Sequence, residues 1–142
     1  MKKITLLILV LFMGLVLYAQ ADGPKPEKYS DVVWHKVSVV DYKPGKVGEA
    51  KEIIAKFQSA AATAGTPVPV EHWFNTGKYD IMVIWELKDS PAELEWIWSP
   101  DGVKWWNALV AQEGSEEAAQ KVQDNYNSLI ASSTTNISRR SN

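Results

Sequence analysis

The sequence predicts an α+β domain with the element order β-α-β-β-α-β. Three observations lead to this fold class. Residues 32–42 alternate between two unlike faces, as a strand does. Residues 47–64 carry apolar side chains at spacings of three and four, as an amphipathic helix does. Residues 70–87 hold two runs of aromatic and β-branched side chains on either side of a glycine, as a β-hairpin does.

The first 21 residues have the composition of a secretory signal peptide. Lys2 and Lys3 precede an apolar run that extends to Tyr18, and the small residues Ala19 and Ala21 follow it. The run is shorter than the ~20 residues of a membrane-spanning helix, which favours cleavage over anchoring. The protein is therefore expected to be secreted or periplasmic, with no membrane contact after cleavage. Residues 22–31, rich in Pro and charge, are expected to form a flexible lead-in.

The predicted first strand has one plain apolar face and one mixed face. Val33, Val37 and Val39 share the odd positions with His35, which suggests a core face. The even positions are mixed, with Trp34, Lys36, Ser38, Val40 and Tyr42. After this strand, Pro44 and Gly45 make a turn, and the predicted helix runs to Ala64, where Gly65 ends it.

The predicted hairpin places its turn at Thr76 and Gly77. Phe74 would then pair with Tyr79, His72 with Ile81 and Val70 with Val83. One face would carry mostly apolar residues, namely Val70, His72, Phe74, Tyr79, Ile81, Val83, Trp85 and Leu87. The other would mix carboxylates with large side chains, namely Glu71, Trp73, Asp80, Met82, Ile84 and Glu86. Neither face is expected to be fully solvated.

The second helical region has two start signals. Residues 90–93 form a Ser-Pro-Ala-Glu capping box, and Ser99 and Pro100 begin a second piece, so a bend is predicted near Trp98. The second piece stops at Gly114, and a short helix follows from Ser115 to about residue 122. Residues 126–137 are predicted to form a last, edge strand, and residues 138–142 a loose tail.

This order is the ferredoxin-like plan, so residues 32–137 are expected to form one ferredoxin-like domain. Two helices can cover only one face of its sheet, and the other face would expose large apolar side chains. A second copy of the chain is the simplest way to bury this face, so we expect a homodimer built as a dimeric α/β barrel.

Composition excludes several classes of function. The chain has 15 basic and 17 acidic residues and no basic cluster before Arg139 and Arg140, so nucleic acid is not expected as a partner. It has no Cys and only two His, which gives no disulfides and no credible metal site. No phosphate-binding loop or nucleophile elbow is present, and no cofactor is expected.

The turns and caps, taken in order, resemble those of a known superfamily. They are Pro44-Gly45-Lys46 after the first strand, Gly77-Lys78-Tyr79-Asp80 in the hairpin, and Asp89-Ser90-Pro91-Ala92-Glu93-Leu94 followed by Ser99-Pro100. Over roughly residues 32–135, the chain resembles the antibiotic-biosynthesis-monooxygenase-like branch of the dimeric α/β-barrel superfamily. The resemblance implies two sheets face to face in a homodimer, and a pocket between the sheet and the helices of each protomer.

The residues that carry chemistry in that superfamily are mostly replaced here. Members include cofactor-free oxygenases, haem-degrading enzymes and sugar mutarotases. Many monooxygenase-like members have a His just before the Ser-Pro step, where this chain has Trp96 and Ile97. The pair Trp105-Trp106 resembles one in the mutarotases, but no helix here carries the His that the mutarotases or the haem degraders require.

Lys36 and His72 are the candidate catalytic residues. A half-buried amine at Lys36 would have a lowered pKa and could act as a base or an anion anchor, although an ion pair at an interface edge explains it as well. His72, beside Ile81 on the predicted apolar face, could be a catalyst or a hydrogen-bonded core residue, and His35 is similar. Glu71, Asp80 and Glu86 could do acid–base work or pair with Lys36 across a dimer.

Tryptophans are the candidate ligand-binding residues. The chain has seven Trp, a residue enriched in binding pockets and interfaces as well as in cores. The candidates are Trp34, Trp73, Trp85, Trp98 and Trp105. The leading hypothesis is an exported, cofactor-free, monooxygenase-like enzyme for a small organic substrate. The alternatives are a non-catalytic ligand-binding or scaffold protein and a mutarotase-like protein with a sugar ligand.

Overall fold

The computed structural model describes residues 23–141. The predicted signal peptide therefore lies outside the described residues. Residues 23–30 form no helix or strand and belong to a separate unit from the domain that begins at Asp31. Among the helices of the described part, none is both long and apolar enough to cross a membrane.

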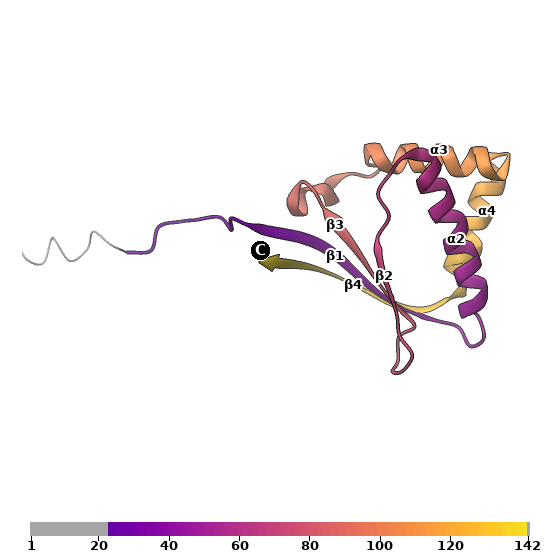
Figure 1. Ribbon diagram of the computed structural model, residues 1–142, viewed down its shortest axis with the longest axis horizontal. Helices are drawn as coiled ribbons and strands as arrows, with labels where there is room; N and C mark the ends of the chain where they lie inside the picture. Colours follow the sequence, from indigo (N-terminus) through magenta and orange to yellow (C-terminus); the bar gives the residue numbers. More distant parts are fainter. Residues whose placement is uncertain (1–22, 142) are drawn as a thin grey trace, which may run out of the picture. The chain divides into compact units, whose positions relative to one another are not determined.

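The domain is α+β, with one four-stranded antiparallel sheet in the order β2-β3-β1-β4, so the ferredoxin-like prediction is confirmed (Figure 1). The strands are β1 (Val32–Tyr42), β2 (Val70–Trp73), β3 (Ile81–Leu87) and β4 (Ile130–Ser141). The edge position of β4 was also predicted. Its last residues were expected to be a tail, but residues 138–141 pair with residues 32–35 of β1.

The helices begin and end largely at the predicted signals. They are α2 (Val47–Ala64), α3 (Pro100–Glu113) and α4 (Glu116–Leu129), with a short 3-10 helix, η1 (Ser90–Glu95), before α3. Gly65 ends α2 at a φ of 64°, in the left-handed region that glycine adopts most easily. The Ser99 hydroxyl accepts a hydrogen bond from the backbone N–H of Gly102, 3.0 Å away, and caps α3.

Two helical predictions are wrong in extent. The expected capping box at residues 90–93 does not form, because the Glu93 carboxylate accepts from the backbone N–H of Lys88 instead, at 2.7 Å. Only the six-residue 3-10 helix η1 follows. The last helix was expected to stop near residue 122, but α4 continues to Leu129, which is buried in the core beneath it.

The hairpin register differs from the prediction by one residue. Trp73 pairs with Ile81, and His72 pairs with Met82 rather than with Ile81. The backbone N–H of Phe74 donates to the carbonyl of Asp80, 2.8 Å away, so the connection is longer than the two-residue turn expected. Because side chains alternate between faces, this shift moves all of β2 to the opposite face relative to β3.

The two faces of β1 are also the reverse of the prediction. Val40 pairs with Ile81, and both are buried beneath the helices, so the even positions of β1 face the helices. The odd positions, predicted to face the core, lie on the other face. We call that second face the open face, and its central apolar residues are Val33, Val37, Val39, Val70, Met82 and Ile84.

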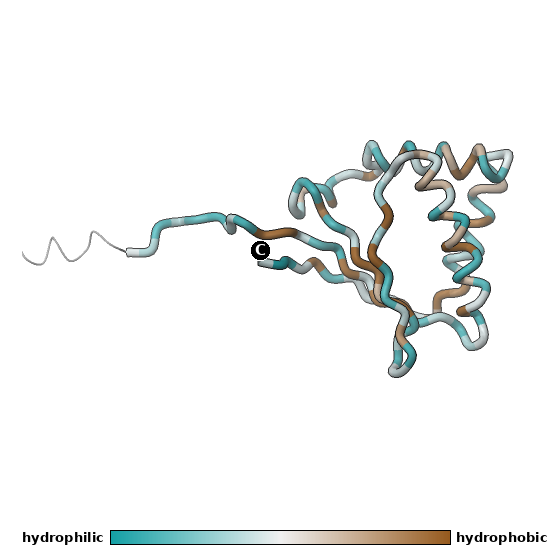
Figure 2. Tube along the Cα trace, in the orientation of Figure 1, coloured by the Kyte–Doolittle hydropathy of each residue, from teal (hydrophilic) through white to brown (hydrophobic). Residues whose placement is uncertain are grey.

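Two hydrophobic clusters hold the domain together. The first joins the sheet to α2 and α4, through residues such as Tyr42, Ile53 and Ile81. The second joins the three helices to one another around Leu109, which is fully buried. Figure 2 shows apolar residues along β1, β2 and β3, whereas β4 is largely polar.

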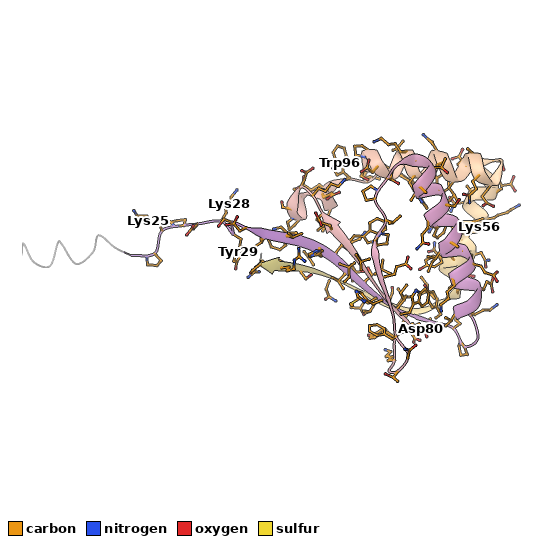
Figure 3. The ribbon with its side chains drawn as sticks, viewed as in Figure 1. Lys25, Lys28, Tyr29, Lys56, Asp80 and Trp96 are labelled. Carbon is orange, nitrogen blue, oxygen red and sulfur yellow. The ribbon has the colours of Figure 1, made fainter. Side chains whose placement is uncertain are left out.

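Asp80, just before β3, binds the backbone of β1 at one end of the sheet. Its carboxylate accepts from the backbone N–H of Tyr42, 2.8 Å away, and its own N–H donates to the carbonyl of Val40, 2.9 Å away. Figure 3 shows Asp80 at the end of the sheet from which the hairpin loop projects. The packed part of the sheet lies at this end, and toward Trp85 the space between sheet and helices opens into a cavity.

Candidate functional site

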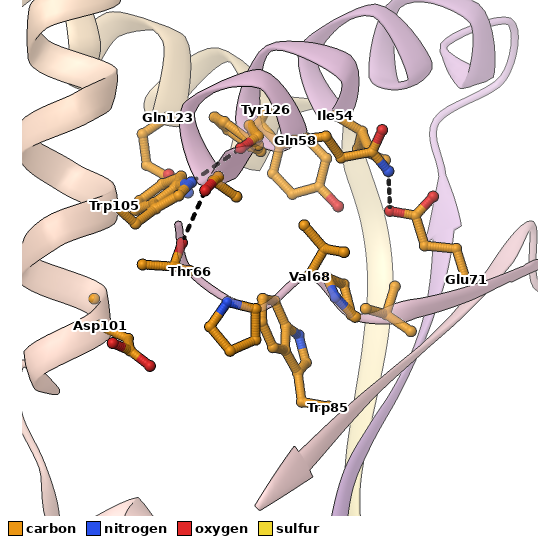
Figure 4. Close-up of a pocket in the computed structure, with 16 residues that line it drawn as sticks. Ile54, Gln58, Thr66, Val68, Glu71, Trp85, Asp101, Trp105, Gln123 and Tyr126 are labelled. Atoms are coloured by element: carbon orange, nitrogen blue, oxygen red, sulfur yellow. Dashed lines mark hydrogen bonds between the residues drawn. The ribbon is translucent and has the colours of Figure 1, made fainter. Parts of the chain in front are cut away.

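A cavity of about 440 Å³ lies between the sheet and the helices. Its walls come from α2, α3 and α4, from β2 and β3, and from the segment 66–69 that leads into β2. Figure 4 shows this lining, with Trp85 on one side and Tyr126 and Gln58 on the opposite side. The volume lies within the range of pockets that bind small molecules.

Aromatic side chains form much of the wall. Phe57 packs edge-on against both Trp105 and Tyr126, with ring centroids 5.5 Å apart in each pair. The indole Nε1 of Trp105 donates to the backbone carbonyl of Phe57, 3.1 Å away, which fixes α3 against α2. Trp85 reaches the cavity from the sheet. A ligand could therefore contact aromatic rings from both layers of the domain.

One end of the cavity is polar, at Glu71. Gln58 Nε2 donates to the Glu71 carboxylate over 3.0 Å, as drawn in Figure 4. The Tyr126 hydroxyl points into the cavity and is hydrogen-bonded to the Tyr42 hydroxyl, with the oxygens 2.9 Å apart. Burial raises the pKa of both phenols, and the negative charge of Glu71 contributes in the same direction.

Asp101 lies on the other side of the cavity from Glu71 in Figure 4. Its carboxylate pairs with the ammonium groups of Lys104, at 3.1 Å, and Lys88, at 3.7 Å. The hydrogen bond from Lys104 holds the pKa of Asp101 below its usual value. The charge of Asp101 is therefore balanced within the protein.

The structure places two of the five candidate ligand-binding tryptophans, Trp85 and Trp105, in the cavity wall. Trp73 instead belongs to the core, stacked on Tyr42 with ring centroids 6.4 Å apart. Trp34 and Trp98 do not line the cavity. Trp34 lies near the Arg139 guanidinium, 6.0 Å from the ring centroid, and Trp98 is 55% exposed.

The two candidate catalytic residues do not line the cavity. Lys36 lies on the helix-facing side of β1, and its Nζ is 6.0 Å from the ring centroid of Trp85. His72 is exposed on the open face of β2. Its predicted neighbour Ile81 lies on the other face, beneath the helices. His35 shares the open face, opposite Glu86. Neither His is near the helices.

The three carboxylates expected to share a face are separated. Glu71 faces the cavity, Glu86 lies on the open face, and Asp80 binds the backbone at the end of the sheet. Among residues 23–141, no group of three His, Asp or Glu side chains is placed to hold a metal ion.

Sequence reasoning missed the hydrogen-bonded pair Tyr42 and Tyr126 and the placement of Glu71. Glu71 was assigned to the wrong neighbours by the one-residue register error. Tyr126 was assigned to a strand because Ser and Thr dominate the segment after it. The signal for its helical position was the spacing of Val122, Tyr126 and Leu129, which continues the buried side of α4.

The fold and the cavity together define a ferredoxin-like α+β protein with an aromatic-lined pocket between its sheet and its helices. No protein-family model matches the chain, and no curated protein matches it. Solved structures that are similar in fold include two NIPSNAP family proteins from Agrobacterium tumefaciens strain C58.

The first of these proteins, whose function is unknown, is 12% identical, with a TM-score of 0.51 over 82% of this chain and 95% of its own. The second is 13% identical, with a TM-score of 0.50 over 85% of this chain and 96% of its own. At such identities the likeness shows the fold alone.

Proposed function

We propose that the protein binds a small, largely apolar organic molecule in the cavity between its sheet and its helices. The observation that carries the proposal is the composition of the wall. Phe57, Trp85, Trp105 and Tyr126 surround the space, and Glu71 and Gln58 supply polar groups at one end. Ligand pockets typically combine apolar walls with a few placed polar groups in this way.

Tryptophan fluorescence tests the proposal, because Trp85 and Trp105 would both touch an occupant. A panel of quinones, sugars, haem and an environment-sensitive apolar dye should include at least one saturable ligand. Trp85→Ala should weaken its binding about tenfold or more, since a stacked aromatic wall is lost. Trp96→Ala is the matched control, because Trp96 is 57% exposed and does not line the cavity. Equal effects of the two substitutions would contradict the proposal.

A second candidate is the cofactor-free, monooxygenase-like reaction that the family resemblance implies. In such a reaction a base removes a proton from an acidic CH2 group of the substrate, and the carbanion then reacts with dioxygen. The carbon is oxidised to a carbonyl that keeps one oxygen atom, and the other oxygen atom leaves as water with the two hydrogens of the CH2 group. Glu71 favours this candidate, because its carboxylate lines the cavity. Lys36 does not line the cavity, but its positive charge near Trp85 would stabilise the negative charge of the carbanion. Oxygen uptake with each ligand found above tests it, and Glu71→Gln should abolish uptake while sparing the binding of neutral ligands.

A sugar ligand and mutarotase-like activity have weaker support. Most residues of the wall are apolar, with few of the polar groups that would satisfy the hydroxyls of a sugar. Polarimetry of a fresh sugar solution, with and without the protein, distinguishes this alternative.

We further propose that two copies of the chain associate through the open face. Val37, Val39, Met82 and Ile84 form an apolar strip there, which the helices do not cover, and Val33 lies beyond the His35–Glu86 pair on the same face. Large exposed apolar patches on soluble proteins usually mark interfaces. Sedimentation velocity at micromolar concentration should show a dimer, and a monomer would contradict this proposal.

Export to the periplasm or the medium is proposed from the composition of residues 1–21. Cell fractionation followed by N-terminal sequencing should find the protein outside the cytoplasm, with a new N-terminus at residues 20–22. An intact N-terminus in the cytoplasm would contradict it.

A further inference from the structure

The charges that line the cavity have one sign. Glu71 and Asp101 are the charged residues of its wall, and no Lys, Arg or His belongs to that wall. Asp101 already has two lysine partners, Lys88 and Lys104. Glu71 has the Gln58 amide as its hydrogen-bond donor and forms no ion pair with any of the described residues.

Nearby lysines are occupied elsewhere. Lys56 on α2 pairs with Glu113 at 3.0 Å, and Lys51 lies over the ring of Trp73, with its Nζ 4.5 Å from the centroid. Lys36 lies on β1, and β3 with Trp85 separates that strand from Glu71 on β2. Glu71 therefore has no charged partner among the described residues, and its carboxylate is open to water or to a charged group in the cavity.

The two neighbouring phenols are affected by the negative charge of Glu71. Tyr42 and Tyr126 resist ionisation partly because Glu71 is negative, so an anion in this part of the cavity would be repelled as well. Aromatic rings favour cations over their faces, and Phe57, Trp105 and Tyr126 line the cavity, whereas the Lys36 ammonium already lies 6.0 Å from the ring centroid of Trp85.

We propose that the ligand of this cavity is an organic cation, a primary or substituted ammonium group on an apolar body, with the charged end at Glu71 and Gln58 and the body between Trp85 and Trp105. This inference rests on the proposed binding function and names the class of its ligand. Apolar contact would supply most of the affinity, and the carboxylate would select the charge.

Three probes of one shape test the inference, namely phenylpropylammonium, phenylpropanol and phenylpropanoate. Their binding is followed by tryptophan fluorescence at neutral pH. The ammonium should bind about tenfold more tightly than the alcohol, since it gains a charge partner and aromatic faces. The carboxylate should bind most weakly. The preference for the ammonium should also shrink as salt is added.

Glu71→Gln should remove the preference. The substituted amide retains an oxygen that can accept from Gln58, so the shape and the internal hydrogen bond are kept while the charge is lost. The affinity for the ammonium should fall to that for the alcohol, and the affinity for the alcohol should not change. Glu52→Gln is the matched control, because Glu52 is exposed on α2 and does not line the cavity.

The outcomes separate this inference from the proposed function. Equal or tighter binding of the alcohol by the unmodified protein overturns the organic cation as ligand, while small-molecule binding stands. An ammonium preference that survives Glu71→Gln also overturns it. If none of the three probes binds but the apolar dye does, the inference falls alone. If the dye also fails to bind, the proposed function falls with it.

Discussion

The hydroxyl oxygens of Tyr42 and Tyr126 lie 2.9 Å apart, and one of these groups donates a hydrogen bond to the other. Tyr42 comes from the end of β1 and Tyr126 from α4, so this bond links the sheet to the last helix. Tyr42 is only 4% exposed, and its ring also stacks on Trp73. The pair therefore stabilises the core and shapes the polar end of the cavity.

The two phenols should make the protein sensitive to alkali. Their pKa values are raised in the folded state by burial, whereas an unfolded tyrosine ionises near pH 10. A folded-state pKa above the unfolded value gives stability that is complete below pH 10 and lost as the pH rises further. Denaturant unfolding measured from pH 8 to pH 11 should show this loss.

The double variant Tyr42→Phe/Tyr126→Phe should lose stability less steeply over that alkaline range, because phenylalanine at these two positions cannot ionise. Tyr126→Phe alone leaves the Tyr42 hydroxyl without its partner and should cost about 1 kcal/mol at neutral pH. Tyr29→Phe, at a position that is 65% exposed, is the control. An unchanged alkaline slope in the double variant would show that other groups cause the loss.

Much of the fold could be predicted from local signals. The spacing of Ile54, Phe57 and Ala61 predicted α2, and Gly65 predicted its end. Ser99 predicted the start of α3. These signals act within a few residues of one another, so the sequence alone is enough to find them. The topology followed from the order of the elements alone.

The hairpin register could not be predicted from local signals. Gly77 has the positive φ expected of a turn residue, 99°, but the loop is longer than the predicted two-residue turn. The residues that close the loop also bind elsewhere in the sheet, since the Asp80 carboxylate accepts from the backbone N–H of Tyr42 on β1, 38 residues away in sequence. Such a contact exists only once the sheet has assembled.

The cavity was predicted only in part for a related reason. Trp85 and Trp105 were candidates because Trp is frequent in pockets, and both line the wall. Lys36 and His72 were chosen for their chemistry, but their positions depend on which face of the sheet meets the helices. That choice is made by packing, since Val40 and Ile81 are buried and the odd positions of β1 are not.

Trp105 should contribute to stability as well as to binding. Trp105→Phe keeps an aromatic ring beside Phe57 but removes the Nε1 donor, so the carbonyl of Phe57 loses its hydrogen bond from α3. The expected cost is about 1 to 2 kcal/mol, measured by urea unfolding. Trp96→Phe is the matched control and should cost almost nothing. Similar losses in both variants would mean that the hydrogen bond between α2 and α3 carries no stability.

The cap at Ser99 fixes the first turn of α3, where Gly102 also lines the cavity. Ser99→Ala removes the acceptor for the backbone N–H of Gly102 and should lower the free energy of unfolding by about 1 kcal/mol. Ser59→Ala, on the exposed side of α2, should have no comparable effect. If Ser99→Ala is as stable as the unmodified protein, water replaces the cap at no cost.

The open face offers the sharpest test of the proposed dimer. Val37 and Ile84 are opposite each other on β1 and β3, at the centre of the apolar strip. Ile84→Lys would place a charge in the interface of both copies without a partner, which should weaken dimerisation about a hundredfold or more. Sedimentation velocity over a range of concentrations would measure the shift to monomer, and circular dichroism would show that each subunit remains folded.

Ser59→Lys adds the same charge on the exposed side of α2 and should leave the dimer intact. A dimer that tolerates Ile84→Lys but not Ser59→Lys would place the interface on the helices, and the apolar strip would then need another explanation.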